Sequence, residues 1–146
     1  MMVIYTYDPN TIIVEPLQDR TKDSILQTYQ NIIGKLTKRG FKPRLQLLDN
    51  EASKLLQNEM YINNINWKIV PPGNHIRNVA ERLIRTFKNH FISILAGTDP
   101  GFALHLWDKL IPQACITINL LQNSHRNPQL LAEENLNGQF DYNKTP

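Results

Sequence analysis

The chain has 146 residues, of which 41% are hydrophobic and 20% charged, and its net charge is +3. These values fit one soluble domain with a buried core, and the mild positive charge only weakly favours a polyanionic partner. One cysteine excludes an internal disulfide, and the four histidines lack the spacing of a zinc site. No apolar run could cross a bilayer and no signal peptide is visible, so we expect an intracellular protein without a membrane partner.

The N-terminal part of the chain predicts a hairpin followed by a helix. Residues 3–7 and 12–14 are rich in β-branched and aromatic side chains, which is typical of strands. Between them, residues 8–10 read Asp-Pro-Asn, which is the composition of a tight turn. Residues 21–39 then carry apolar side chains at helical spacing, and Gly40 ends this predicted helix.

The middle of the chain alternates strands and helices. Residues 45–48 read as a short buried strand, and a helix is predicted over residues 51–62. A second strand follows at residues 67–70, and then a helix at residues 76–95. This alternation indicates an α/β fold.

The C-terminal part of the sequence is predicted to be helical. Residues 102–121 form an apolar helix that Pro112 bends or splits, and its Trp107 is expected to belong to the core. A short helix starts at Asn127 and runs through Leu136. The predicted class is therefore α/β with a helical C-terminal half.

Two carboxylates stand out within these predicted elements. Asp49 directly follows the strand at residues 45–48, and Glu81 shares one side of its helix with basic residues. Each has a structural alternative. Asp49 could cap the helix that follows it, and Glu81 could form surface pairs with Arg77 and Arg85.

The order of these elements resembles the catalytic core of retroviral and retrotransposon integrases, and of the copia type in particular. The resemblance is strongest at residues 70–82 (VPPGNHIRNVAER), where a proline-containing loop leads to an Asn-x-x-Glu-Arg motif on a basic helix. Residues 106–121 and the closing Asn-Lys-Thr-Pro at residues 143–146 are also similar. The likeness spans essentially the whole chain, although the interval of 32 residues between Asp49 and Glu81 is slightly shorter than is usual in the family.

The resemblance implies a ribonuclease H-like fold and the chemistry of a polynucleotidyl transferase or endonuclease. In that family, three carboxylates hold two Mg²⁺ or Mn²⁺ ions that activate water or a DNA 3′-hydroxyl. Asp49 and Glu81 would be two of these catalytic metal ligands, and no small-molecule cofactor is implied. The residues implied to contact transposon-end or target DNA are Arg77, Asn78, Arg85 and Lys88. Asn78 could equally be a solvated polar residue at the start of the helix.

The third acid of the family belongs to an opening strand upstream of residue 3, and this sequence offers no match for it. Asp8 is a turn residue, and the hairpin would place it at the opposite rim from Asp49. We therefore expect residues 1–138 to be an integrase core that is incomplete at its N-terminus, and residues 139–146 to be a polar tail. The missing strand is the central one of the resembled fold, so its neighbours would have unpaired edges.

We therefore expect the chain to be a fragment of a retrotransposon polyprotein. It would keep two of the three acidic ligands and have little or no strand-transfer activity by itself. It would act in the nucleus if it were part of a functional integration complex. Two alternatives stay open. The chain could be a non-catalytic nucleic-acid-binding module that uses Arg77, Arg85 and Lys88. It could also be a structural remnant whose helix at residues 102–121 packs against a second copy, since a homodimer fits the resembled family.

Overall fold

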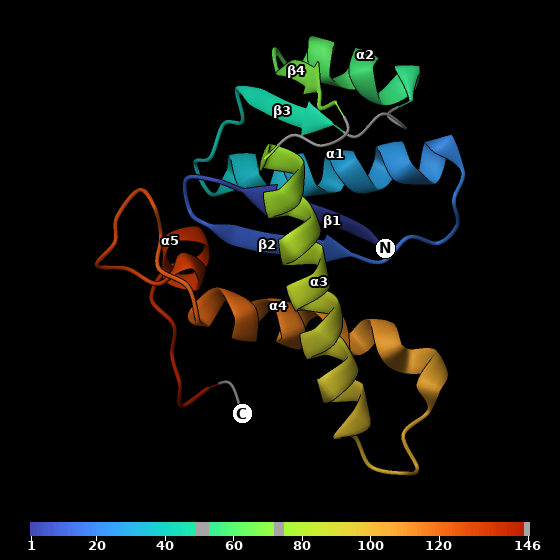
Figure 1. Ribbon diagram of the computed structural model, residues 1–146, viewed down its shortest axis with the longest axis vertical. Coiled ribbons are helices and arrows are strands. Elements are labelled where there is room, and N and C mark those ends of the chain that lie inside the picture. Colours follow the sequence, from blue (N-terminus) through green and yellow to red (C-terminus); the bar gives the residue numbers. More distant parts are fainter. Residues whose placement is uncertain (49–52, 72–74, 145–146) are drawn as a thin grey trace. The chain divides into compact units, whose positions relative to one another are not determined.

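The computed structural model describes residues 1–48, 53–71 and 75–144, and for residues 75–80 it describes the backbone only (Figure 1). Strands, helices and one 3₁₀ helix (η1) follow one another along this part of the chain. In order they are β1 (Met2–Thr6), β2 (Thr11–Glu15), α1 (Lys22–Lys38), β3 (Leu45–Leu48), α2 (Lys54–Ile62), β4 (Asn66–Ile69), α3 (His75–Ala96), η1 (Leu104–Leu110), α4 (Ile111–Leu120) and α5 (Ala132–Asn137). The predicted mixed α/β class is confirmed.

The contacts within the chain define two compact units, and each is described by itself. The hairpin unit consists of Met1, Val3–Pro16 and Leu83–Pro146, and it holds β1, β2 and the C-terminal helices. The parallel-strand unit consists of Met2 and Leu17–Arg82, and it holds α1, β3, α2 and β4. The helix α3 begins in the second unit and continues into the first.

In the hairpin unit, β1 and β2 are joined by the predicted Asp-Pro-Asn turn. The Asn10 amide donates to the Tyr7 carbonyl at 3.0 Å, and Asn10 has a φ of 59°. Asparagine adopts this left-handed conformation more readily than most residues. The sequence prediction of a hairpin is therefore confirmed, with β1 one residue earlier than predicted and β2 one residue longer at each end.

The core of the hairpin unit forms where β2, α3 and α4 meet. Phe87 and Phe91 of α3 stack with their ring centroids 5.7 Å apart. Ile12 of β2 and Ile118 of α4 are buried in the same cluster. Burial of each such side chain contributes roughly 1.5–3 kcal/mol, and the apolar face predicted for α3 is confirmed in its described part.

The predicted apolar helix over residues 102–121 is divided in two. Its second half, α4, begins at Ile111 with Pro112 in the first turn, where the missing proline N–H would have had no helical partner. Its first half is the 3₁₀ helix η1, none of whose residues is buried. Trp107 was expected in the core, but it only packs its ring edge against Phe91 and keeps 37% of its surface exposed.

A buried asparagine on α4 covers the outer edge of β2. The Ile12 amide donates to Asn119 Oδ1 at 2.9 Å, and Asn119 Nδ2 donates to the Ile12 carbonyl at 3.0 Å. The same Nδ2 lies 3.3 Å from Oε2 of the buried Glu133. One side chain thus satisfies both backbone groups that a further strand would otherwise pair with at this position.

The segment before α5 is a turn, so the helix predicted from Asn127 to Leu136 begins too early. The Asn127 carbonyl accepts from the Leu130 amide at 2.9 Å, and Leu131 forms an antiparallel bridge with Asn123. The buried Ser124 fixes this turn, because its Oγ donates to the Asp8 carbonyl at 3.2 Å and accepts from nearby amides. Tertiary hydrogen bonds to the hairpin turn therefore outcompete the local helical preference of these residues.

In the parallel-strand unit, both helices begin at hydroxyl caps. Thr21 Oγ1 accepts from the Ser24 amide at 3.3 Å at the start of α1, as its sequence predicts. Ser53 Oγ accepts from the Leu56 amide at 3.3 Å at the start of α2. The helix predicted from residue 51 therefore starts at Lys54, and its cap is Ser53.

The strands β3 and β4 pair in parallel, with Leu45 opposite Asn66 and Leu48 opposite Ile69. Within the described ranges, no third strand joins this pair. The position predicted for β3 is confirmed, but its predicted burial is wrong except at Leu48. Four apolar side chains are between 37% and 52% exposed, namely Leu45, Leu47, Trp67 and Ile69. Parallel strands are usually covered on both faces, and the described part of the chain does not cover β3 in this way.

Candidate nucleic-acid-binding site

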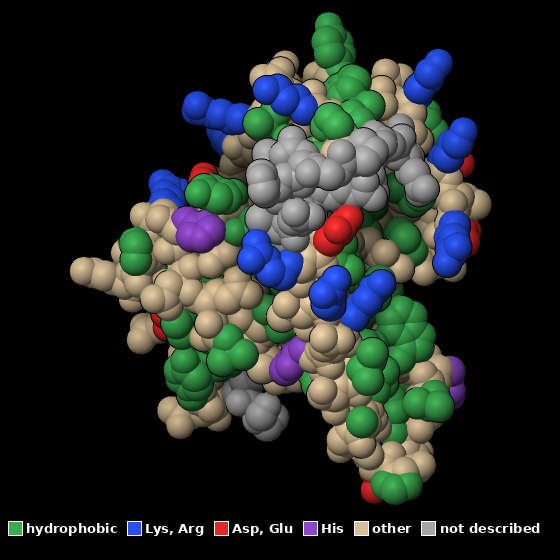
Figure 2. Space-filling model, viewed as in Figure 1, with side chains coloured by type: hydrophobic (Ala, Val, Ile, Leu, Met, Phe, Trp, Pro, Cys, Tyr) green, Lys and Arg blue, Asp and Glu red, His purple; other side chains and the backbone are tan. Residues whose placement is uncertain are grey.

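The exposed face of α3 carries the charged residues that the sequence singled out. Glu81, Arg85 and Lys88 are all exposed, and their spacing of four and three residues places them on one side of the helix. Phe87 and Phe91 lie on the other side and are buried. Figure 2 shows lysine and arginine side chains gathered over the middle of α3 with an acidic side chain among them. The predicted division of α3 into a core face and a charged face is confirmed from Glu81 onward.

The other predicted site residues are not placed by the structure. Asp49 lies outside the described residues, and so do the side chains of Arg77 and Asn78. The structure does define the end of β3, where the Leu48 carbonyl accepts from the Val70 amide at 3.0 Å. The carboxyl ends of parallel strands are common positions for ligand-binding residues. The described cap of α2 is Ser53, and the role of Asp49 itself stays a prediction.

A metal centre is not assembled by the described residues alone. Among them, no three histidine, cysteine, aspartate or glutamate side chains come together as a cation site. The exposed carboxylate of Glu81 is the oxygen ligand that Mg²⁺ prefers, but a single carboxylate does not hold the ion in place. The proposed pairing of Glu81 with Asp49 stays a prediction.

The lone cysteine is not suited to nucleophilic chemistry. Burial raises the pKa of the Cys115 thiol to about 11, an outcome that a hydrogen bond with the Val14 backbone reduces in part and the charges of Glu133 and Glu15 support. A thiol is reactive as the thiolate, which is scarce near neutral pH when the pKa is raised. Cys115 packs against the core of the hairpin unit as a small apolar side chain.

His125 and Tyr7 form a contact at the hairpin turn. Their ring centroids are 4.7 Å apart, and His125 Nδ1 lies 2.8 Å from the Tyr7 carbonyl. This hydrogen bond links the C-terminal segment to the hairpin, as those of Ser124 do. The role of His125 is therefore structural.

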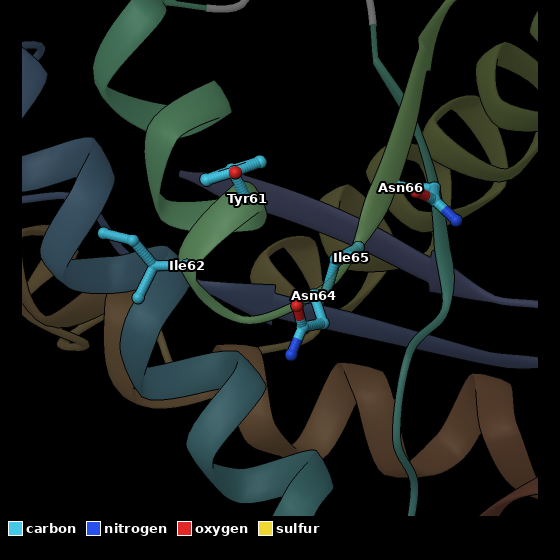
Figure 3. Close-up of a pocket in the computed structure, with 5 residues that line it drawn as sticks. All are labelled: Tyr61, Ile62, Asn64, Ile65 and Asn66. Atoms are coloured by element: carbon cyan, nitrogen blue, oxygen red, sulfur yellow. The ribbon is translucent and has the colours of Figure 1, made fainter.

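A shallow depression of about 490 Å³ lies where α2 turns into β4 (Figure 3). It is lined by Tyr61, Ile62, Asn64, Ile65 and Asn66. Figure 3 shows that the labelled side chains of Tyr61, Ile62 and Asn64 point in different directions and do not converge on one point. Among the residues that the structure describes, no acid, histidine, lysine or arginine lines the depression, which gives it no evident chemistry.

Polar groups that were not predicted from the sequence organise the hairpin unit, above all Asn119 and Ser124. A signal for Asn119 was present, because it is in helical phase with Ile111 and Cys115 on the buried side of α4. A polar side chain within an apolar stripe must find hydrogen-bond partners when it is buried. Ser124 carried no comparable signal, because it lies in a loop.

No protein-family model and no curated protein sequence matches this chain. Within the described ranges, no helix has both the length and the apolar composition needed to span a membrane.

Proposed function

We propose that this chain is an integrase-core-like fragment that binds DNA through the exposed face of α3 and has little or no strand-transfer activity by itself. The observation that supports DNA binding is the exposure of Arg85 and Lys88 on one side of a helix whose other side is buried. A helix held in this way presents its cations to a phosphate backbone without ordering a loop first.

The low activity follows from the number of acidic ligands. Two-metal phosphodiester chemistry needs carboxylates that hold both ions and align the attacking oxygen. The resemblance assigns Asp49 and Glu81 to this role and leaves the third acid without a counterpart. Loss of one ligand weakens metal binding and misplaces the nucleophile, to which such reactions are highly sensitive.

DNA binding is tested by fluorescence anisotropy with a labelled duplex at several salt concentrations. We expect the double variant Arg85→Ala/Lys88→Ala to bind DNA more weakly. The slope of the logarithm of the association constant against the logarithm of the salt concentration should become smaller by about two, since each phosphate contact contributes about one. A matched control is Lys22→Ala/Lys38→Ala, which removes two exposed cations from α1. An equal loss in both double variants would contradict a site on α3.

Catalysis is tested by nicking of supercoiled DNA with Mg²⁺ or Mn²⁺. We expect no metal-dependent nicking above background. Nicking that disappears in both Asp49→Ala and Glu81→Ala would show that the fragment is an active nuclease. DNA binding that survives these two changes but weakens without Arg85 and Lys88 would leave a binding module without catalysis.

A further inference from the structure

The segment η1 is rich in apolar residues and yet buries none of them. We give the name apolar corner to three exposed side chains of η1 and one of α3, in the region where Figure 2 shows hydrophobic side chains gathered over η1 and the C-terminal turns of α3. Its members are Ile92, Leu104, Leu106 and Trp107, which are between 37% and 71% exposed. Large apolar side chains that gather on a surface commonly mark an interaction site, whereas isolated ones need no explanation.

The apolar corner is anchored to the core of the hairpin unit. The Trp107 ring meets Phe91 edge-on, with the centroids 6.2 Å apart, and Phe91 adjoins Ile92 on α3. The turn between α3 and η1 is fixed by Thr98 Oγ1, which donates to the Leu95 carbonyl at 2.7 Å. The corner is therefore presented on a structured support, which lowers the entropic cost of binding a partner.

Cations border the apolar corner. Lys88 lies one helical turn before Ile92 on α3, and Arg85 lies nearly one turn further back. Lys109 follows Trp107 by two residues and is also exposed. Figure 2 shows this arrangement, with basic side chains over the middle of α3 and hydrophobic side chains over its C-terminal turns and η1.

The two nearby acidic side chains are held by local contacts. Asp99 accepts from the Gly101 amide at 2.7 Å and so shapes the turn before η1. Asp108 lies 3.8 Å from the ammonium group of Lys109, its neighbour in the chain. Both carboxylates keep their negative charge, so three cations (Arg85, Lys88 and Lys109) stand against two carboxylates (Asp99 and Asp108), which leaves a net positive charge beside the corner.

We infer that the apolar corner is a docking site for an acidic protein segment with large apolar side chains, such as an amphipathic helix with leucines beside glutamates. Apolar anchors would cover Trp107 and Leu104, and carboxylates would lie near Lys88 and Arg85. Charge complementarity favours this partner over a second copy of the chain, because a two-fold contact through the corner would bring Lys88 of both copies together. The inference does not depend on DNA binding.

The test uses a labelled synthetic helical peptide with leucines along one face and glutamates flanking them, measured by fluorescence anisotropy. We expect Ile92→Ser and Leu104→Ser each to weaken binding about tenfold, since an interfacial leucine contributes on the order of 1.4 kcal/mol. The matched control is Leu121→Ser, which removes an equally exposed leucine at the end of α4. The Lys88→Glu variant should bind the acidic peptide more weakly than the unchanged chain does. It should bind more tightly a peptide in which lysines replace the glutamates.

Three results would overturn the inference. Peptide binding that is unchanged in Ile92→Ser and Leu104→Ser would place the peptide elsewhere. A dimer in sedimentation velocity that both variants abolish would make a second copy the occupant. Flotation with anionic phosphatidylserine vesicles that both variants abolish, without peptide binding, would make a lipid surface the partner. Circular dichroism checks that the variants fold. The variants Ile92→Ser and Leu104→Ser should also keep the DNA affinity of the unchanged chain, which separates this test from the test of the proposed function.

Discussion

The hairpin β1–β2 and the pair β3–β4 are both two-stranded, but they differ in how completely other elements cover them. In β2, Ile12 and Val14 are buried against α3 and α4, and Asn119 occupies the strand edge. In β3 and β4, Leu45, Leu47 and Trp67 keep more than a third of their surface exposed, and only Leu48 of the β3 leucines is buried. Both pairs are apolar in sequence. The difference shows that strand composition predicts a strand, whereas its burial depends on which other elements reach it.

The largest contrast is expected between matched core and surface truncations. Ile12→Ala should lower the free energy of unfolding by about 2–5 kcal/mol, because it removes buried methyl groups and leaves a cavity in the hairpin unit. Leu45→Ala should lower it by less than about 1 kcal/mol, because half of that side chain is already in water. Urea denaturation followed by circular dichroism measures both. Equal effects would mean that β3 is covered as well as β2.

The buried asparagine on α4 comes next. Asn119→Ala should lower the free energy of unfolding by about 2–4 kcal/mol, because it leaves the Ile12 amide, the Ile12 carbonyl and Glu133 short of buried partners. Gln113→Ala on the exposed side of α4 is the control and should change stability by less than about 0.5 kcal/mol. Similar losses in the two variants would show that Asn119 does not protect the edge of β2.

Alkaline pH should lower the stability of the hairpin unit through ionisation of Cys115. Burial raises the pKa of its thiol from 9.0 to about 11, so the folded chain keeps a proton that the unfolded chain releases. The contribution of this thiol to the free energy of unfolding is fully present below its pKa in the unfolded chain. It is lost as the pH rises, by about 1 kcal/mol between about pH 8 and about pH 10. Thermal unfolding of Cys115→Ala over this range should show a smaller loss than the unchanged chain. An unchanged slope would indicate that other groups cause the loss.

The smallest expected effect concerns the parallel-strand unit. The buried hydroxyl of Tyr29 on α1 has no hydrogen-bond partner within the described part of the chain. Burial, with a contribution from the charge of Glu59, raises its pKa to about 12. Removing an unsatisfied buried hydroxyl relieves a desolvation cost, so Tyr29→Phe should raise the free energy of unfolding by up to about 1 kcal/mol. A loss of stability in urea denaturation would reveal a partner for this hydroxyl.

The sequence by itself determined the features that depend on local chemistry. Turn residues 8–10, the cap at Thr21 and Gly40 after α1 set the ends of the first elements. The spacing of Phe87 and Phe91 against Arg85 and Lys88 set the two faces of α3. These features depend on backbone preference and on helical period, both of which act over a few residues.

Only the tertiary structure decided which apolar residues are covered and where the later helices begin. The polar side chains of Ser124 and Asn119 bind groups more than 100 residues away, which fixes the turn before α5 and the edge of β2. For the same reason, Leu45 and Leu47 of β3 and Trp107 of η1 have their predicted positions in the chain but not their predicted burial. The exposure of a side chain depends on contacts between distant segments, and a local sequence pattern does not contain that information.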